Sequence, residues 1–178
     1  AAVRERIARA ADRASRSPGD VTLVAISKTH PADSVRAAFA AGVRDFGENR
    51  VQEAEPKIAS TADLAASGLC WHLVGHLQSN KVNVVNRLCE LVHSVGSDSS
   101  ARRVAIPALL EVNLSGEESK SGVRPEEIGA YVRQYPLICG LMTMPPLAAD
   151  PEAESITVKK EGDAVTTSGK SYDVKDGD

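Results

Sequence analysis

The chain has 178 residues, of which 42% are hydrophobic and 25% are charged. This is the composition of an ordinary globular protein, and the length suits one domain with a core of its own. A net charge of −3 and an aromatic content of 3% argue against a nucleic-acid-binding protein, which needs a basic surface and stacking side chains. No apolar stretch approaches membrane-spanning length, so we expect neither nucleic acid nor a membrane as a partner.

The three cysteines, Cys70, Cys89 and Cys139, are odd in number, far apart and embedded in apolar runs. A disulfide framework or a metal site would need paired or clustered cysteines. We therefore interpret them as reduced core residues of a cytoplasmic protein.

An amphipathic helix is expected over residues 1–16, followed by a strand over residues 21–28 that ends in Lys28. The run is rich in β-branched residues and carries no charge before Lys28, which is typical of a buried strand in a parallel sheet. A lysine partly withdrawn from water has a lowered pKa, and its neutral amine can form a Schiff base with a carbonyl compound. The alternative is a lysine that leaves the sheet and is solvated in a loop.

Helical and strand patterns then alternate along the chain. The expected helices cover residues 31–41, 51–60, 81–88 and 125–135, and the expected strands cover residues 43–46, 69–77, 91–95, 108–114 and 137–144. Pro56 is expected to kink or restart its helix. The connection over residues 96–107 is barely long enough to cross between parallel strands, which takes about a dozen residues. The alternation predicts a parallel α/β fold, either an open sheet or a TIM-barrel-like (β/α) arrangement.

Each expected strand ends in a polar cluster. These clusters contain Lys28, Asn49, His76, Ser94, Glu111 and Met142. Because the carboxyl ends of parallel strands meet at one rim, and barrel enzymes carry their chemistry there, we expect a functional site at this rim.

His72 and His76 have the spacing of zinc ligands on a helix, but their segment reads as a strand and no glutamate follows the first histidine. We interpret them as the polar lining of a ligand mouth and expect no metal. The glycine-rich loop at residues 116–122 does not have the order of a phosphate-binding Walker loop. No serine or cysteine lies in a recognisable nucleophile motif, so a hydrolase has little support.

The sequence changes character at residue 153, and this defines two expected segments, 1–152 and 153–178. Residues 156–178 are rich in Gly, Ser, Thr, Asp and Lys and have few large apolar side chains. We expect either a small hairpin or a disordered tail, too short for two further βα units of roughly thirty residues each.

Several motifs in the same order carry a resemblance to a known family. They are Ser-Lys-Thr at 27–29, Gly-Glu-Asn-Arg-Val-Gln-Glu at 47–53, Trp-His-Leu-Val-Gly-His-Leu-Gln-Ser-Asn-Lys at 71–81, His-Ser-Val at 93–95, Glu-Val-Asn-Leu-Ser-Gly-Glu-Glu-Ser-Lys-Ser-Gly at 111–122 and Gly-Leu-Met-Thr-Met at 140–144. In these residues the chain resembles the pyridoxal phosphate homeostasis proteins, which are similar in fold to the N-terminal barrel of alanine racemase.

The resemblance implies a (β/α)8-type barrel in which pyridoxal 5'-phosphate is held as an aldimine on Lys28. It also implies a cytoplasmic protein that buffers or delivers the cofactor, with pyridoxal-phosphate-dependent apoenzymes as candidate partners and no well-established turnover. Asn49, His76, Ser94 and Met142 end successive expected strands, so a barrel would place them near the cofactor or on the rim around it. Other lysines, such as Lys57, are expected at the surface.

Two stretches depart from the family's pattern. The connection over residues 96–107 is shorter than the family's fourth connection, and nothing after Glu152 resembles the family. In the family, that later part supplies the last two strands, the backbone cradle for the cofactor phosphate and an arginine facing the pyridine nitrogen. The expected barrel is therefore incomplete relative to eight units.

Two other functions stay open. An amino-acid racemase would need a second acid or base opposite Lys28. Tyr131 and Tyr135 lie on an expected helix away from the rim, and Tyr172 lies in the tail, so the sequence favours a cofactor binder and assigns no catalytic residue. The third possibility is a truncated relative that binds no cofactor. A racemase assay and an absorption spectrum separate the three.

The missing resemblance after Glu152 generates a prediction about affinity. Hydrogen bonds from backbone amides to a phosphate are worth about 1.5–3 kcal/mol each, so without the cradle pyridoxal should bind about as well as pyridoxal phosphate. Titration with both aldehydes measures the two dissociation constants. A strong preference for the phosphorylated form would show that a cradle exists, for which the stretch Thr166-Thr167-Ser168-Gly169-Lys170-Ser171 is the candidate.

Overall fold

The computed structural model describes residues 2–114, 121–144, 158–161 and 164–167. Six strands form one parallel sheet in the order of the sequence. They are β1 (Val24–Ile26), β2 (Asp45–Glu48), β3 (Cys70–Leu73), β4 (Leu91–Val95), β5 (Ala108–Glu111) and β6 (Ile138–Met142). The sheet confirms the predicted parallel β/α architecture of the TIM-barrel type.

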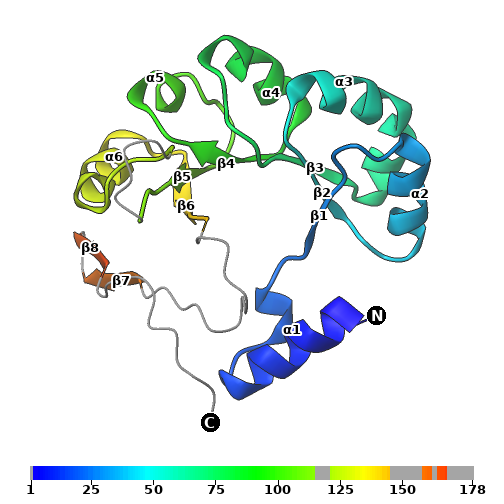
Figure 1. Cartoon of the computed structure of the whole chain (residues 1–178), viewed down its shortest axis with the longest axis horizontal. Helices are drawn as coiled ribbons and strands as arrows, with labels where there is room; N and C mark the ends of the chain where they lie inside the picture. Colours follow the sequence, from blue (N-terminus) through cyan, green and yellow to red (C-terminus); the bar gives the residue numbers. More distant parts are fainter. Residues whose placement is uncertain (1, 115–120, 145–157, 162–163, 168–178) are drawn as a thin grey trace.

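Helices connect the successive strands and cover the convex side of the curved sheet (Figure 1). They are α2 (Ala32–Ala40), α3 (Val51–Ser60), α4 (Val82–Leu88), α5 (Asp98–Ala101) and α6 (Ile128–Gln134), with short 3-10 turns η1 (Pro18–Asp20), η2 (Ala62–Ser67), η3 (Ser79–Lys81) and η4 (Pro125–Glu127). The first helix, α1 (Ala2–Arg13), lies apart from this layer, on the concave side of the sheet. No helix among the described residues is long and apolar enough to span a membrane.

The hydrophobic core fills the space between the sheet and the outer helices. Phe46 on β2 and Trp71 on β3 are both buried, with ring centroids 5.8 Å apart, and they pack with Val35 of α2. Val92 and Leu110 of β4 and β5 belong to the larger part of the core. Because side chains alternate across a strand, residues on either side of Phe46 face the inside of the curve, and Glu48 returns to the helical side.

Lys28 does not close a buried strand, contrary to the sequence-based expectation. β1 ends at Ile26, Lys28 is exposed in the following turn, and Val21 is also exposed. Among the described residues, β1 lies at the edge of the sheet and pairs with β2 alone, through three residue pairs. The alternative of a lysine solvated after the strand is therefore the one observed, and the expected withdrawal of its amine from water is wrong.

Other differences concern single residues. α3 runs through Pro56 as one helix. Cys139 is exposed on β6, so it is not a core residue, whereas Cys89 is buried and all three cysteines are free thiols. Burial raises the pKa of the Cys89 thiol to about 12. The short connection before β5 contains the one-turn helix α5. The Ser97 hydroxyl caps its N-terminus by accepting a hydrogen bond from the Ser100 amide.

Part of the expected tail is described as two strands, β7 (Val158–Glu161) and β8 (Ala164–Thr167), which pair in antiparallel fashion. β8 lies against α6 and η4. Residues 153–157 and 168–178 lie outside the described residues, and with them most of the candidate phosphate cradle. The boundary at residue 152 therefore stays a prediction.

Gly75 permits a close approach of two backbone segments at the carboxyl edge of the sheet. A Cβ atom on Gly75 would lie 2.3 Å from the carbonyl oxygen and 2.6 Å from the Cα atom of Asn49. The Gly75 carbonyl oxygen accepts a hydrogen bond from the Ser94 hydroxyl, which ties β3 to β4 at the same level. Three strands are therefore held together around this glycine.

We predict that Gly75→Ala lowers the free energy of unfolding by about 1–3 kcal/mol, because the clash is with backbone atoms that cannot turn away. Urea unfolding followed by circular dichroism measures the change. The matched control is Gly129→Ala in α6, where the added carbon meets only the flexible end of Arg133 at 3.3 Å. That control should be neutral or stabilising, because alanine favours a helix more than glycine does. Equal losses in the two variants would contradict the prediction.

Candidate functional site

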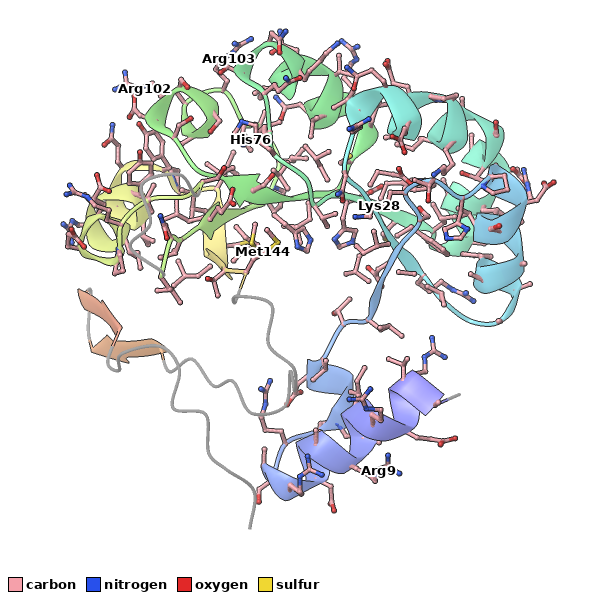
Figure 2. The ribbon with its side chains drawn as sticks, viewed as in Figure 1. Arg9, Lys28, His76, Arg102, Arg103 and Met144 are labelled. Carbon is pink, nitrogen blue, oxygen red and sulfur yellow. The ribbon has the colours of Figure 1, made fainter. Side chains whose placement is uncertain are left out.

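Lys28 lies in a tight turn at the carboxyl end of β1, and its side chain is exposed. Figure 2 shows Lys28 and His76 near the sheet, whereas Arg102 and Arg103 lie on the outer ring of helices. The turn is closed by a hydrogen bond from the His30 amide to the Ser27 carbonyl oxygen, at 3.1 Å. It places Thr29 at φ 65°, in the left-handed region that a threonine rarely adopts. The amine of Lys28 is thus accessible to small molecules at the rim.

A buried polar cluster lies directly behind this turn, and we call Ser27, Glu48 and Lys57 the anchor cluster. The Ser27 hydroxyl donates to Glu48 Oε1 at 2.6 Å. Lys57 Nζ donates to the same oxygen at 2.5 Å and to the Ser27 carbonyl oxygen at 2.7 Å. Glu48 is 0% exposed and Lys57 is 8% exposed. Glu48 Oε2 is also buried and has no hydrogen-bond partner among the described residues.

The anchor cluster follows from alternation on β2 and from the helical period of α3. Glu48 shares the helical side of β2 with Phe46, and Lys57 shares the buried side of α3 with Val51 and Ala54. The expectation that Lys57 lies at the surface is wrong. The sequence does place Glu48 and Lys57 at positions where the pattern of the strand and of the helix calls for an apolar residue. It does not show that the two side chains contact each other.

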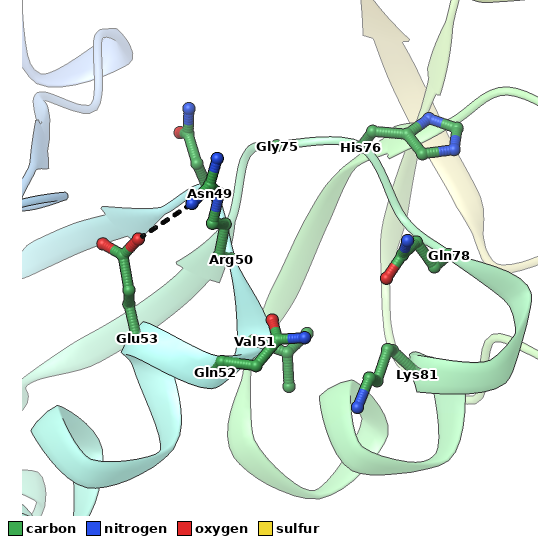
Figure 3. Close-up of a pocket in the computed structure, with 9 residues that line it drawn as sticks. All are labelled: Asn49, Arg50, Val51, Gln52, Glu53, Gly75, His76, Gln78 and Lys81. Atoms are coloured by element: carbon green, nitrogen blue, oxygen red, sulfur yellow. Dashed lines mark ion pairs between the residues drawn. The ribbon is translucent and has the colours of Figure 1, made fainter.

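A cavity of about 650 Å³ opens at the carboxyl edge between α3 and η3 (Figure 3). Its lining consists mostly of polar residues, namely Asn49, Arg50, Val51, Gln52, Glu53, Gly75, His76, Gln78 and Lys81. Gln52 lies on one side of the opening and Gln78 and Lys81 on the other. Arg50 and Glu53 form a weak ion pair at 3.9 Å. The volume and the polar lining suit a small molecule.

The structure places the predicted site residues at the same edge of the sheet but with different surroundings. Asn49 and His76 both line the cavity, although the His76 ring points away from Asn49 (Figure 3). Ser94 is only 2% exposed and its hydroxyl is committed to the Gly75 carbonyl oxygen. Met142 is half-buried at the end of β6, two strands further along the sheet. Lys28 does not line this cavity. Contact of each residue with a cofactor stays a prediction.

Glu111 is an acidic residue of the rim that was not among the predicted site residues. It ends β5, and its Oε2 atom is buried without a hydrogen-bond partner among the described residues. Burial raises the pKa of the Glu111 carboxyl group, and the nearby His76 opposes this rise. Glu111 therefore adds a carboxyl group with a raised pKa to the same edge of the sheet as the cavity.

His72 belongs to a chain of hydrogen bonds with His93 and Asp45, and it is not among the residues that line the cavity of about 650 Å³. Its Nδ1 lies 2.8 Å from Nε2 of His93, and its Nε2 lies 3.2 Å from Oδ1 of Asp45. Burial lowers the pKa of His93, and the neighbouring His72 lowers it further. Both nitrogens of His72 are used within the chain. Among the described residues, no group of three or more His, Cys, Asp or Glu is arranged to hold a metal ion.

Taken together, these features support binding of a small carbonyl compound more than acid–base turnover. A primary amine condenses with an aldehyde and releases water. Lys28 carries such an amine, in a turn whose first residue is bound by the anchor cluster. The adjacent cavity offers amides and cations that suit a polar or anionic ligand.

Comparison with known proteins identifies the family. The model of the alanine racemase N-terminal domain matches residues 1–166, which extends past the end of the resemblance noted in the sequence. The pyridoxal phosphate homeostasis protein of Pseudomonas aeruginosa is 45% identical over 168 residues, covering 86% of this chain and 72% of the relative. The protein of the same name from Escherichia coli K12 is 38% identical over 170 residues, covering 88% and 71%.

Solved structures show the same similarity. PipY of Synechococcus elongatus PCC7942, solved with pyridoxal phosphate bound, is 38% identical with a TM-score of 0.66, and the match covers 80% of this chain and 71% of PipY. The crystal structure of an unknown protein from Bifidobacterium adolescentis is 36% identical with a TM-score of 0.71, and the match covers 83% of this chain and 68% of that protein. The chain therefore belongs to the alanine racemase N-terminal domain family, among the relatives named pyridoxal phosphate homeostasis proteins.

Proposed function

We propose that the protein binds pyridoxal 5'-phosphate and takes part in its homeostasis, with Lys28 as the residue that holds the cofactor. The observation that carries this proposal is the exposed amine of Lys28 at the carboxyl end of β1. Support also comes from relatives named for pyridoxal phosphate homeostasis and from PipY, which was solved with pyridoxal phosphate bound.

The residues present fit the chemistry of this group. Pyridoxal phosphate carries an aldehyde, a phosphate and an aromatic ring. The amine of Lys28 suits the aldehyde, and the positive groups of Arg50 and Lys81 in the cavity suit an anion. Asn49 and His76 lie in the same lining and are the polar groups proposed to contact the cofactor, with Ser94 behind them and Met142 further along the rim.

A role in homeostasis requires that the cofactor can leave again. A Schiff base is reversible, because water can attack it and regenerate the amine and the aldehyde. The turn that carries Lys28 is open to solvent, which would allow release toward a recipient apoenzyme. Delivery to pyridoxal-phosphate-dependent apoenzymes in the cytoplasm is part of this proposal.

The positions of two tyrosines favour a binder over a racemase. Racemisation needs an acid or base on the face opposite the lysine. Tyr131 lies in α6 and Tyr135 directly follows it, in the outer helical layer, and the Tyr135 hydroxyl donates to the carboxylate of Asp98 in α5. Neither tyrosine lies at the carboxyl edge of the sheet where Lys28 lies.

We predict that borohydride reduction of the protein with pyridoxal phosphate gives a stable adduct on Lys28, located by peptide mass spectrometry. Reduction converts the Schiff base into a secondary amine, so it marks the lysine that formed the bond. Lys28→Ala should abolish both the adduct and the change in the absorption spectrum.

The matched control is Lys81→Ala, which removes another lysine at the same edge of the sheet. This variant should keep the adduct on Lys28, with at most a weaker affinity from the lost positive charge. An adduct found on Lys81 or on other lysines while Lys28 stays unmodified would contradict the proposal.

A further inference from the structure

The anchor cluster has a composition that stability alone does not require. Glu48 and Lys57 are almost fully buried, and moving two charges out of water costs several kcal/mol per ion. Packed apolar residues at such positions commonly give equal or greater stability. A buried ion pair is therefore weak evidence for stability, and its partners indicate what else it does.

Two of the three contacts in the anchor cluster are made to Ser27, the residue before Lys28. Lys57 Nζ holds the Ser27 carbonyl oxygen at 2.7 Å, and Glu48 Oε1 holds the Ser27 hydroxyl at 2.6 Å. The Ser27 amide donates to the Gly47 carbonyl oxygen at 3.0 Å. The amide of Ser27 is thus held by the backbone of β2, and its hydroxyl and carbonyl oxygen are held by Glu48 and Lys57.

A second contact from α3 holds the turn beyond Lys28. Glu53 Oε2 accepts a hydrogen bond from the Thr29 amide at 3.3 Å, and Thr29 has its uncommon φ of 65°. A left-handed threonine is strained and persists only where its surroundings hold it. Lys57 and Glu53 are on the same helix, so α3 holds the backbone on both sides of Lys28.

We propose that Glu48 and Lys57 are positioning residues that fix the direction of Lys28 by anchoring Ser27. The hydroxyl of Ser27 points to the helical side, whereas Ile26 of β1 lies on the inner side beside Gly47. Fixing Ser27 therefore fixes the point from which the backbone enters the turn that carries Lys28. The ion pair thereby keeps an exposed and otherwise flexible lysine in one orientation. This inference rests on the proposed function, because it concerns the lysine proposed to hold the cofactor.

The test uses variants that remove the contacts without leaving a lone buried charge. Glu48→Gln combined with Lys57→Met removes both charges together, whereas Ser27→Ala removes only the hydroxyl contact and is the milder variant. The control is Val92→Ala, which lowers stability through a buried residue of β4 that touches neither Lys28 nor the cavity. Urea unfolding of each variant first establishes that it folds and how much stability it has lost.

Two measurements follow on the full chain. Titration with pyridoxal phosphate, followed by the absorption band of the Schiff base, gives the dissociation constant. Hydrogen exchange of the Thr29 and His30 amides in the cofactor-free protein reports on the turn itself. The double variant should raise the dissociation constant about tenfold or more and speed exchange of these two amides by a similar factor, since hydrogen bonds to charged groups are worth this much. Ser27→Ala should raise the dissociation constant and the two exchange rates by only a few-fold.

The control decides between positioning and general destabilisation. Val92→Ala should leave the dissociation constant within about twofold of the parent at 25 °C, because a protein that stays folded keeps its turn. An unchanged dissociation constant and unchanged exchange in the double variant would overturn the inference, and so would an equal weakening in Val92→Ala. If the parent protein forms no Schiff base with pyridoxal phosphate, the proposed function fails, and the exchange of Thr29 and His30 alone decides whether the anchor cluster holds the turn.

Discussion

The buried contact between Lys57 of α3 and Glu48 of β2 is the constraint on which the site depends. It joins α3 to β2 and to the end of β1 at the carboxyl edge of the sheet, because both partners also bind Ser27, which follows β1. Charges this deep cost free energy to desolvate, and here the cost is offset through Glu48 Oε1, which accepts from both Lys57 and Ser27. The contact therefore selects one arrangement of β1, β2 and α3.

The neighbouring part of the rim is held by a different device, close backbone packing. Gly75 lets β3 pass against Asn49, and the Ser94 hydroxyl fixes the Gly75 carbonyl from β4. The cavity opens between these fixed points, with side chains from α3 on one side and from η3 on the other. A rigid backbone with exposed polar side chains suits a protein that binds a cofactor and releases it, since little of the binding free energy is spent on ordering the site.

The order of the elements could be predicted from the sequence, because alternating helical and apolar strand patterns are local, and β4 has the bounds that were expected. The exposure of Lys28 could not, because an apolar run does not reveal that its strand is the sheet edge. The burial of Lys57 and the chain from Asp45 through His72 to His93 were missed for a related reason. Each joins residues of separate elements whose facing sides become known only once the sheet is assembled.

The most direct test of this account is the state of the Lys57 ammonium group in the cofactor-free protein. Nitrogen-15 NMR of the lysine side chains observes ammonium protons only when hydrogen bonds and burial slow their exchange with water. We expect a slowly exchanging ammonium signal for Lys57 that shifts in Glu48→Gln, whereas the exposed Lys28 amine should exchange rapidly. A Lys57 ammonium that exchanges as fast as that of Lys28 would contradict the claim that this ion pair anchors the site.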